Sequence, residues 1–149
     1  MQQIDKITLP NKFLLEQILA YVGQGKQVTI RVKGNSMWPF LKDGDSVLLK
    51  QFELKELSIG AIVLVKMNDQ MLLHRVVKYD KVTIWLAGDN NLVVRELVNY
   101  ADVVATVIGL YRGEVAVRFN QRWRRHLGRA WYLARPLRCV IKNCIKMIF

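Results

Sequence analysis

The sequence predicts a mainly β fold, with a short helix before it and a basic amphipathic helix after it. From Gln27 onward, apolar and polar residues alternate with a period of two, which is typical of a strand with one buried face. Apolar residues recur at helical spacing before this region and again beyond Phe119. Of the 149 residues, 52% are hydrophobic, so the chain has enough apolar material for one domain with its own core.

The N-terminal helix is indicated by Asn11, a favourable N-cap, and by the apolar residues that follow it at helical spacing. These residues are Phe13, Leu14, Ile18, Tyr21 and Val22. Gly23 and Gly25 are typical of the end of a helix. We therefore expect an N-terminal helical segment over residues 1–25.

The central region contains a series of predicted strands. In the first of them Val28, Ile30 and Val32 share one side. Further β-rich runs follow at residues 46–49, 61–67, 71–79, 82–87 and 103–110. Residues 68–69 (Asn-Asp) and 79–81 are typical of tight hairpin turns, so the runs that they join should pair antiparallel. The sequence predicts a mostly antiparallel, partly closed sheet over residues 26–117.

The C-terminal tail, residues 118–149, combines an apolar stripe with a basic one. The apolar stripe consists of Trp123, Leu127, Ala130, Trp131, Ala134, Leu137, Ile141, Cys144, Ile145 and Ile148. The basic stripe consists of Arg118, Arg122, Arg125 and Arg129. Pro136 should kink or divide this helix, because proline lacks a backbone N–H. From Arg112 onward there are ten basic residues and one acidic residue, so an anionic partner should meet the tail first.

Composition excludes several classes of protein. The hydrophobic content rules out wholesale disorder, and 9 Gly, 3 Pro and 2 Cys rule out a collagen or a disulfide scaffold. The first residues lack the apolar segment of a secretory signal, and no run of about 18 apolar residues predicts a transmembrane span. Cys139 and Cys144 lie outside any metal-ligand spacing. We expect two reduced thiols in a cytoplasmic protein, with S-acylation as the alternative.

The loop after the first strand contains a candidate nucleophile, Ser36. Gly34, two residues earlier, permits backbone angles that a side chain would forbid, and Pro39 stiffens the exit from the turn. A rigid turn of this kind can present one hydroxyl and leave nearby N–H groups for an oxyanion hole. The alternative is that the serine serves the turn alone.

The candidate base is His74, since His126 lies among tail arginines and is expected to be solvated. Period-two alternation places His74 on the face of its neighbours Leu72 and Val76, where a hydrogen-bonded core histidine is the alternative. A hairpin between the strands at 71–79 and 82–87 would return residues 88–91 towards His74. Asp89 could then accept the imidazole N–H, or could simply serve a turn.

Four segments in order carry a family resemblance. Residues 34–41 read Gly-Asn-Ser-Met-Trp-Pro-Phe-Leu and are followed by Gly-Asp and a short apolar strand. Residues 60–65 read Gly-Ala-Ile-Val-Leu-Val, residues 74–77 His-Arg-Val-Val, and residues 88–91 Gly-Asp-Asn-Asn. Together they resemble the motifs of the type I signal peptidase and LexA/UmuD superfamily. The last two resemble its Ser–His branch, which includes signal peptidases of the endoplasmic reticulum and of archaea.

The resemblance implies a coiled half-barrel with Ser36 as nucleophile and His74 as general base and then general acid. It implies that the nucleophile and oxyanion loop consists of Gly34, Asn35, Ser36, Met37 and Pro39. Because Gly34 has no hydroxyl, backbone N–H groups are left to form the oxyanion hole. No cofactor and no metal is implied.

The resemblance leaves the acid that orients His74 open. Ala61 replaces the acid of the Gly-Asp-Ile-Val motif, and Arg95 stands where the Ser–His branch often has a further acid. Asp89 is then the expected orienting acid, with Asp102 as the alternative. We also expect no N-terminal membrane anchor of the kind typical of signal peptidases.

The function that the resemblance implies is a serine endopeptidase that cleaves a leader or signal-like peptide in trans. One alternative is a catalytically inactive peptide-binding module of the same fold, and another is a LexA-like regulator. Only 35 residues precede Ser36, which is short for a helix-turn-helix domain. No Ala-Gly or Cys-Gly bond lies upstream of Ser36, so self-cleavage is not expected.

The tail has two competing interpretations. Trp123, Arg125, Arg129 and Trp131 suit contact with an anionic membrane surface, which would keep the protein in the cytoplasm or at the inner face of a membrane. Alternatively, the apolar stripe packs on the sheet while the arginines stay in water. Nucleic-acid binding is not expected, because no aromatic-bearing sheet motif accompanies the charge.

Overall fold

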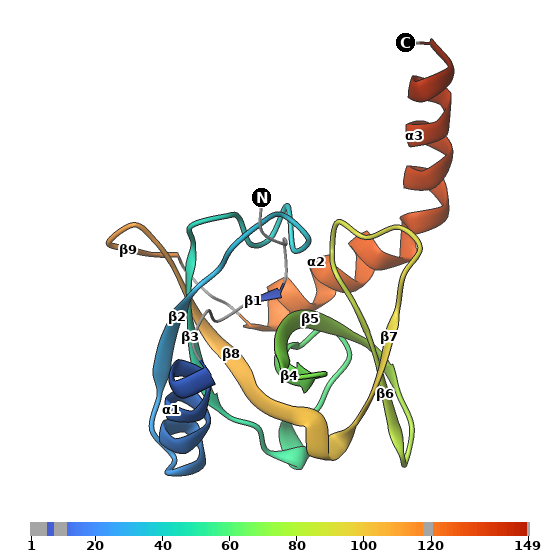
Figure 1. The fold of residues 1–149 in the computed structure, drawn as a ribbon. Coiled ribbons are helices and arrows are strands. Elements are labelled where there is room, and N and C mark those ends of the chain that lie inside the picture. The colour runs from blue at the N-terminus through green and yellow to red at the C-terminus, as the bar shows by residue number, and fades with distance from the viewer. Residues whose placement is uncertain (1–5, 8–11, 118–120, 149) are drawn as a thin grey trace.

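The chain forms one antiparallel sheet with a helix before it and two helices after it (Figure 1). The computed structural model describes residues 6–7, 12–117 and 121–148. The helices are α1 (Lys12–Gly23), α2 (Gln121–Leu133) and α3 (Arg135–Ile148). The strands are β1 (Lys6–Ile7), β2 (Val28–Arg31), β3 (Ser46–Gln51), β4 (Ile62–Met67), β5 (Gln70–Tyr79), β6 (Thr83–Ala87), β7 (Glu96–Asn99), β8 (Val103–Arg112) and β9 (Val115–Val117).

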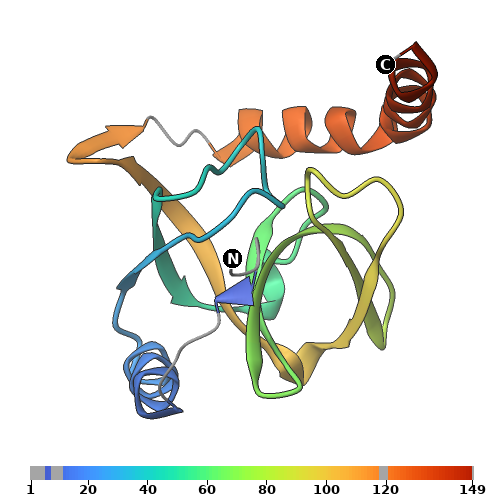
Figure 2. The same cartoon turned by 45° about the horizontal axis from the view of Figure 1, so that its top comes forward.

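The sheet order is β2-β3-β8-β4-β5-β6-β7, with β1 paired to β5 and β9 paired to β8. All of these pairings are antiparallel. Among the described strands, the end strands β2 and β7 do not pair with each other, so the sheet coils round without closing (Figure 2). The predicted mainly β fold with flanking helices is confirmed, and the sheet is open.

Local sequence accounts for the two hairpins at the centre of the sheet. Asn68 and Asp69 adopt φ values of 48° and 59°, as expected for the two-residue turn that joins β4 to β5. In the next turn the Asp80 carboxylate accepts hydrogen bonds from the backbone N–H groups of Val82 and Thr83, both at 2.8 Å. Both predicted hairpins are therefore present.

Sequence patterning does not predict the shortest strands. β1, β7 and β9 were not predicted, because runs of two, four and three residues are too short for periodicity to show, and β1 lies in the segment that was expected to be helical. The predicted N-cap Asn11 lies outside the described residues, although α1 itself begins at Lys12 as expected.

The apolar residues form two clusters. One includes Ile18 and Val22 of α1 together with residues of β2, β3, β4, β5 and β8, so α1 shares the core of the sheet. The other lies where β4, β5, β6 and β7 pack together, and it contains Leu72 and Val76. These two residues share the face of β5 on which His74 was predicted to lie.

The C-terminal helices divide at Pro136, as predicted. α2 ends at Leu133, and Pro136 lies in the first turn of α3, where its missing N–H is tolerated. α2 crosses the sheet domain, whereas α3 projects away from it (Figures 1 and 2). Among the described residues no helix is long and apolar enough to cross a membrane.

Two glycines allow α2 to approach the sheet domain closely. A Cβ added at Gly60, which has φ +93°, would lie 2.7 Å from the backbone oxygen of Arg125 in α2. A Cβ added at Gly128 of α2 would lie 2.3 Å from the Arg75 guanidinium of β5. Larger residues would push α2 off the domain, so its docking is specific.

The buried carboxylate of Asp45 fixes the strand that follows the Ser36 turn. Asp45 accepts hydrogen bonds from Arg112 at 2.8 and 2.9 Å and from the backbone N–H of Lys42 at 2.9 Å. Burial raises the pKa of Asp45, but Arg112 and the Lys42 N–H outweigh it, so its pKa lies below the ordinary value. The ionised carboxylate therefore stabilises the fold at neutral pH.

Replacing Asp45 with Asn should lower the free energy of unfolding by about 1–3 kcal/mol at pH 7, because charge-assisted hydrogen bonds are lost. The lowered pKa means that this contribution is present above the ordinary carboxyl pKa and is lost as pH falls through the folded-state value. The difference between wild type and variant in urea denaturation should therefore shrink in acid. Asp69→Asn, at a side chain that is 95% exposed, is the control. Equal stabilities of Asp45→Asn and wild type at pH 7 would contradict this role.

Candidate active site

The turn that carries Ser36 has the backbone geometry that its sequence predicts. Gly34 adopts φ 89°, the left-handed region that a side chain disfavours, and its N–H donates to Asp43 at 2.6 Å. Met37 and Leu41 are buried and anchor the turn in the first core cluster. The Trp38–Pro39 peptide bond is cis. The turn is thus held at both ends, with Ser36 between them.

Ser36 faces the loop that follows β6. Its backbone oxygen accepts a hydrogen bond from the N–H of Asn90 at 2.7 Å. The residue is 7% exposed, and within the described part of the chain its Oγ is shielded and has no hydrogen-bond partner. A buried hydroxyl without a partner is uncommon in proteins and marks this serine for a role beyond the turn.

His74 lies at the centre of the sheet, on β5, and is fully buried. The β5–β6 hairpin pairs Arg75 with Ala87 and so places Gly88 next to His74. A Cβ at Gly88 would lie 3.0 Å from His74 Nε2 and 3.4 Å from Ser36 Cβ. His74 Nε2 and Ser36 Cβ both lie within 3.4 Å of the position that this Cβ would take. The imidazole and the serine side chain are therefore close to each other.

The acid that contacts His74 is Glu96, at the start of β7. Its carboxylate lies 2.8 Å from His74 Nδ1, and its side chain is 18% exposed. A carboxylate accepts hydrogen bonds, so this contact places the proton on Nδ1 and leaves Nε2 as the acceptor of the neutral ring. Nε2 is the nitrogen on the side of Ser36 and Gly88.

The expected orienting acid, Asp89, has a different partner. Its carboxylate accepts two hydrogen bonds from Arg75, both at 2.7 Å, and both side chains are 2% exposed. Burial raises the pKa of Asp89, and the charge and hydrogen bonds of Arg75 oppose that rise. The prediction that Asp89 orients His74 is corrected, because its oxygens serve Arg75 and the Nδ1 contact is made by Glu96.

The alternative acid, Asp102, also serves local structure: its carboxylate accepts a hydrogen bond from the backbone N–H of Asn99. Sequence reasoning missed Glu96, which is one position beyond Arg95, the residue at which an acid was sought. An acid was thus sought one position too early, and no local pattern points to Glu96.

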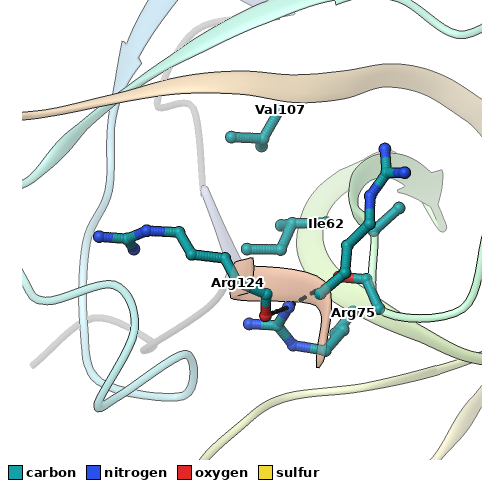
Figure 3. A pocket seen from close by; sticks show the side chains of 7 residues that line it. Ile62, Arg75, Val107 and Arg124 are labelled. Atoms are coloured by element: carbon teal, nitrogen blue, oxygen red, sulfur yellow. Dashed lines mark hydrogen bonds between the residues drawn. The ribbon is translucent and has the colours of Figure 1, made fainter. Parts of the chain in front are cut away.

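Arg75 connects the candidate site to α2. Its Nη1 donates to the Gly60 oxygen at 2.7 Å and to the Arg124 oxygen at 3.5 Å. Figure 3 shows the Arg75 side chain beside Arg124, Ile62 and Val107, with the bond to the Arg124 main chain dashed. The Arg75 guanidinium also lies 4.8 Å from the centre of the Phe40 ring, in the Ser36 turn.

Residues predicted to contact a membrane occupy two kinds of environment. Trp123 and Arg129 are exposed on α2, and Arg125 is partly buried. Trp131 packs edge-to-face against Trp38 and Phe40 and donates from Nε1 to the Asp89 oxygen at 2.8 Å. Trp131 therefore packs on the sheet domain, as the alternative interpretation of the tail expected.

Within the described ranges, no group of three or more His, Cys, Asp and Glu side chains could hold a metal ion. A groove of about 450 Å³ lies beside Ser36, between residues 90–93 and α3. The chemistry that this arrangement offers is therefore a hydroxyl, an imidazole and a carboxylate in series, next to an open groove.

Comparison with known families agrees with this geometry. The Peptidase S24-like family model matches residues 1–111. The chain belongs to this family. The Peptidase S24-like domain thus includes Ser36, His74 and Glu96 and ends before α2, which confirms the predicted LexA, UmuD and signal peptidase superfamily. No curated protein matches the sequence closely enough to be named as a relative.

Gly88→Ala should disable the S24-like site, because the added Cβ would meet the Ser36 backbone oxygen at 2.9 Å and His74 Nε2 at 3.0 Å. We expect a loss of about 1–3 kcal/mol in the free energy of unfolding from overpacking, together with loss of any peptidase activity. Urea denaturation and peptide cleavage measure the two effects. Gly23→Ala, where nothing lies within 4 Å of the added Cβ, is the control. An unchanged Gly88→Ala protein would refute the close packing of Ser36, His74 and residue 88.

Proposed function

We propose that the protein is a serine endopeptidase that cleaves a leader or signal-like peptide in trans, with Ser36 as nucleophile, His74 as base and Glu96 as orienting acid. The observation that carries the proposal is the convergence of Ser36 and His74 Nε2 on Gly88, with Glu96 on the other ring nitrogen. Membership of the S24-like family supports the serine chemistry.

In the proposed reaction Ser36 Oγ attacks the carbonyl carbon of the scissile peptide bond while His74 Nε2 takes its proton. The tetrahedral intermediate collapses as the imidazolium gives that proton to the departing amine, which leaves an ester on Ser36. Water, deprotonated by the same nitrogen, then hydrolyses the ester. Glu96 fixes the tautomer of the neutral imidazole and stabilises the imidazolium in both halves of the reaction.

Backbone N–H groups of the turn would stabilise the oxyanion. Gly34 provides no side-chain hydroxyl for this purpose, so the turn has to do it through the main chain. Each such donor contributes about 3–4 kcal/mol to transition-state stabilisation in related chemistry. The left-handed backbone at Gly34 and the tie from Asn90 to Ser36 support a turn rigid enough for this role.

The shielded Ser36 Oγ gives the alternative, a peptide-binding module without catalysis, its own support. The two functions differ in a single readout. A peptidase converts a bound peptide to two products, whereas a binding module retains it intact.

Incubation with a peptide library, with products identified by mass spectrometry, tests the proposal. We expect Ser36→Ala and His74→Ala to abolish cleavage, and Glu96→Gln to reduce kcat by about three to four orders of magnitude, because the tautomer is no longer fixed. Asp102→Asn, whose carboxylate serves the backbone, is the control. Cleavage that survives the Ser36 and His74 substitutions would remove the dyad, and binding without products from wild type would favour the module.

We also propose that α3 holds the enzyme on an anionic membrane surface. Its exposed apolar residues lie on one side of the helix: Leu137, Val140, Ile141, Ile145 and Met147. These side chains are exposed, and α3 itself projects away from the sheet domain (Figure 1). The chain from Arg112 onward carries ten basic residues and one acidic residue, and each Lys or Arg contributes about 1 kcal/mol near an anionic surface.

Ile141→Ser with Ile145→Ser should weaken binding to phosphatidylserine-containing vesicles by about tenfold or more, because two apolar side chains no longer enter the lipid. Vesicle co-sedimentation measures this. The control is Val82→Ser with Val115→Ser, two apolar residues of the sheet domain that are more exposed than the α3 pair. Equal loss from both pairs, or no loss from the α3 pair, would exclude a specific role for α3.

A further inference from the structure

The groove beside Ser36 has α3 as its second wall. Its α3 lining consists of Cys139, Lys142, Asn143 and Lys146, and its other lining residues are Ser36 and residues 90–93. The α3 residues follow one another at spacings of three, one and three, so they share one face of the helix. This face lies opposite the apolar side described above. α3 therefore presents a polar, cationic face to the groove and an apolar face to the surroundings.

Several hydrogen bonds hold α3 against the loop that follows β6. Arg135, at the start of α3, donates to the backbone oxygens of Asn91 and, at 3.2 Å, of Val94. Arg138 donates a hydrogen bond to the Asp89 backbone oxygen at 2.9 Å. Its guanidinium carbon also lies 3.9 Å from the centre of the Trp131 ring. The residues bound by α3 thus belong to the same loop that places Gly88 against Ser36 and His74. Loop and helix form one unit.

The charge of the groove selects the kind of ligand. Both lining cations, Lys142 and Lys146, come from α3, and the lining residues include no carboxylate. Within the described part of the chain neither lysine makes an ion pair. Ser36 Oγ at the other wall also has no hydrogen-bond partner there. A ligand in this groove would lie against Ser36, whose Oγ is shielded, on one side and against two lysines on the other.

We propose that α3 is a specificity element of the peptidase, and that Lys142 and Lys146 bind acidic side chains of the peptide substrate. The proposal rests on the function proposed above and adds a substrate class to it. An extended peptide that places its scissile bond at Ser36 runs through the groove and passes α3. Glutamate or aspartate in the passing segment pairs with the lysines, whereas lysine or arginine there is repelled.

A binding experiment with Ser36→Ala separates this proposal from catalysis. Fluorescein-labelled peptides of one Ala-rich sequence carry a pair of Glu residues, or a pair of Gln residues, moved stepwise along the chain. Fluorescence anisotropy measures the Kd of each. At the positions that reach α3, we expect the Glu peptide to bind about fivefold more tightly than its Gln counterpart, since two exposed charge pairs of modest strength form.

Lys142→Gln with Lys146→Gln, added to Ser36→Ala, should bring that ratio close to one. Lys26→Gln with Lys81→Gln removes the same charge from exposed sites on the sheet domain and should leave the ratio at about five. A ratio that falls equally in both double variants would show that net charge alone selects the peptide and would overturn the proposal. So would a ratio of one in the parent protein at every position.

Failure of the two proposals gives different results. If wild type cleaves library peptides but neither cleavage nor binding depends on Glu against Gln, the α3 inference is wrong and the peptidase stands. If the Lys142 and Lys146 substitutions weaken binding to anionic vesicles and leave the peptide ratio unchanged, the lysines serve the membrane instead. If no peptide is bound or cut, the proposed function fails, and the α3 inference fails with it.

Discussion

The buried ion pair between Arg75 and Asp89 is the contact on which the rest of the arrangement depends. It joins β5 to the loop after β6 with two hydrogen bonds of 2.7 Å, and both partners are almost fully buried. The same guanidinium reaches the Gly60 backbone and lies over Phe40 of the Ser36 turn. Removing one partner of such a pair costs about 3–5 kcal/mol, because the other charge stays buried. The Arg75 side chain thus connects β5 with the loop after β6, the Gly60 backbone and the Ser36 turn.

β5 contributes both His74 and Arg75, which face opposite sides because alternate residues of a strand do so. His74 faces Glu96, and Arg75 faces the Gly60 loop and α2. One strand therefore positions the imidazole and also docks the C-terminal helices. The family region ends at residue 111, yet α2 and α3 contact the loop that completes the site. These contacts join the tail to the S24-like domain, whatever surface its apolar side meets.

Sequence patterning predicted much of this arrangement and failed at identifiable places. The hairpins, α1, the division at Pro136 and the approach of residues 88–91 to His74 follow from local rules: turn residues, periodicity and the missing N–H of proline. Glu96 was missed because its contact with His74 crosses from β7 to β5, which are not neighbours, and no local rule fixes which carboxylate arrives. The environment of Trp131 was left open between a membrane and the sheet domain, because an amphipathic stripe does not show what will cover it; in the structure the ring packs on Trp38 and Phe40. The wall that α3 provides beside Ser36 depends on side-chain contacts of Arg135 and Arg138 that periodicity cannot specify.

The protonation of the His74 ring tests the central geometry most directly, without any knowledge of the substrate. Nitrogen-15 NMR of the imidazoles, with the exposed His126 as internal reference, reports which ring nitrogen carries the proton at neutral pH. The account predicts a proton on His74 Nδ1, protected from solvent and shifted downfield by Glu96, and loss of this signal in Glu96→Gln. A proton on Nε2, or a His74 ring that exchanges like His126, would contradict the convergence of these groups.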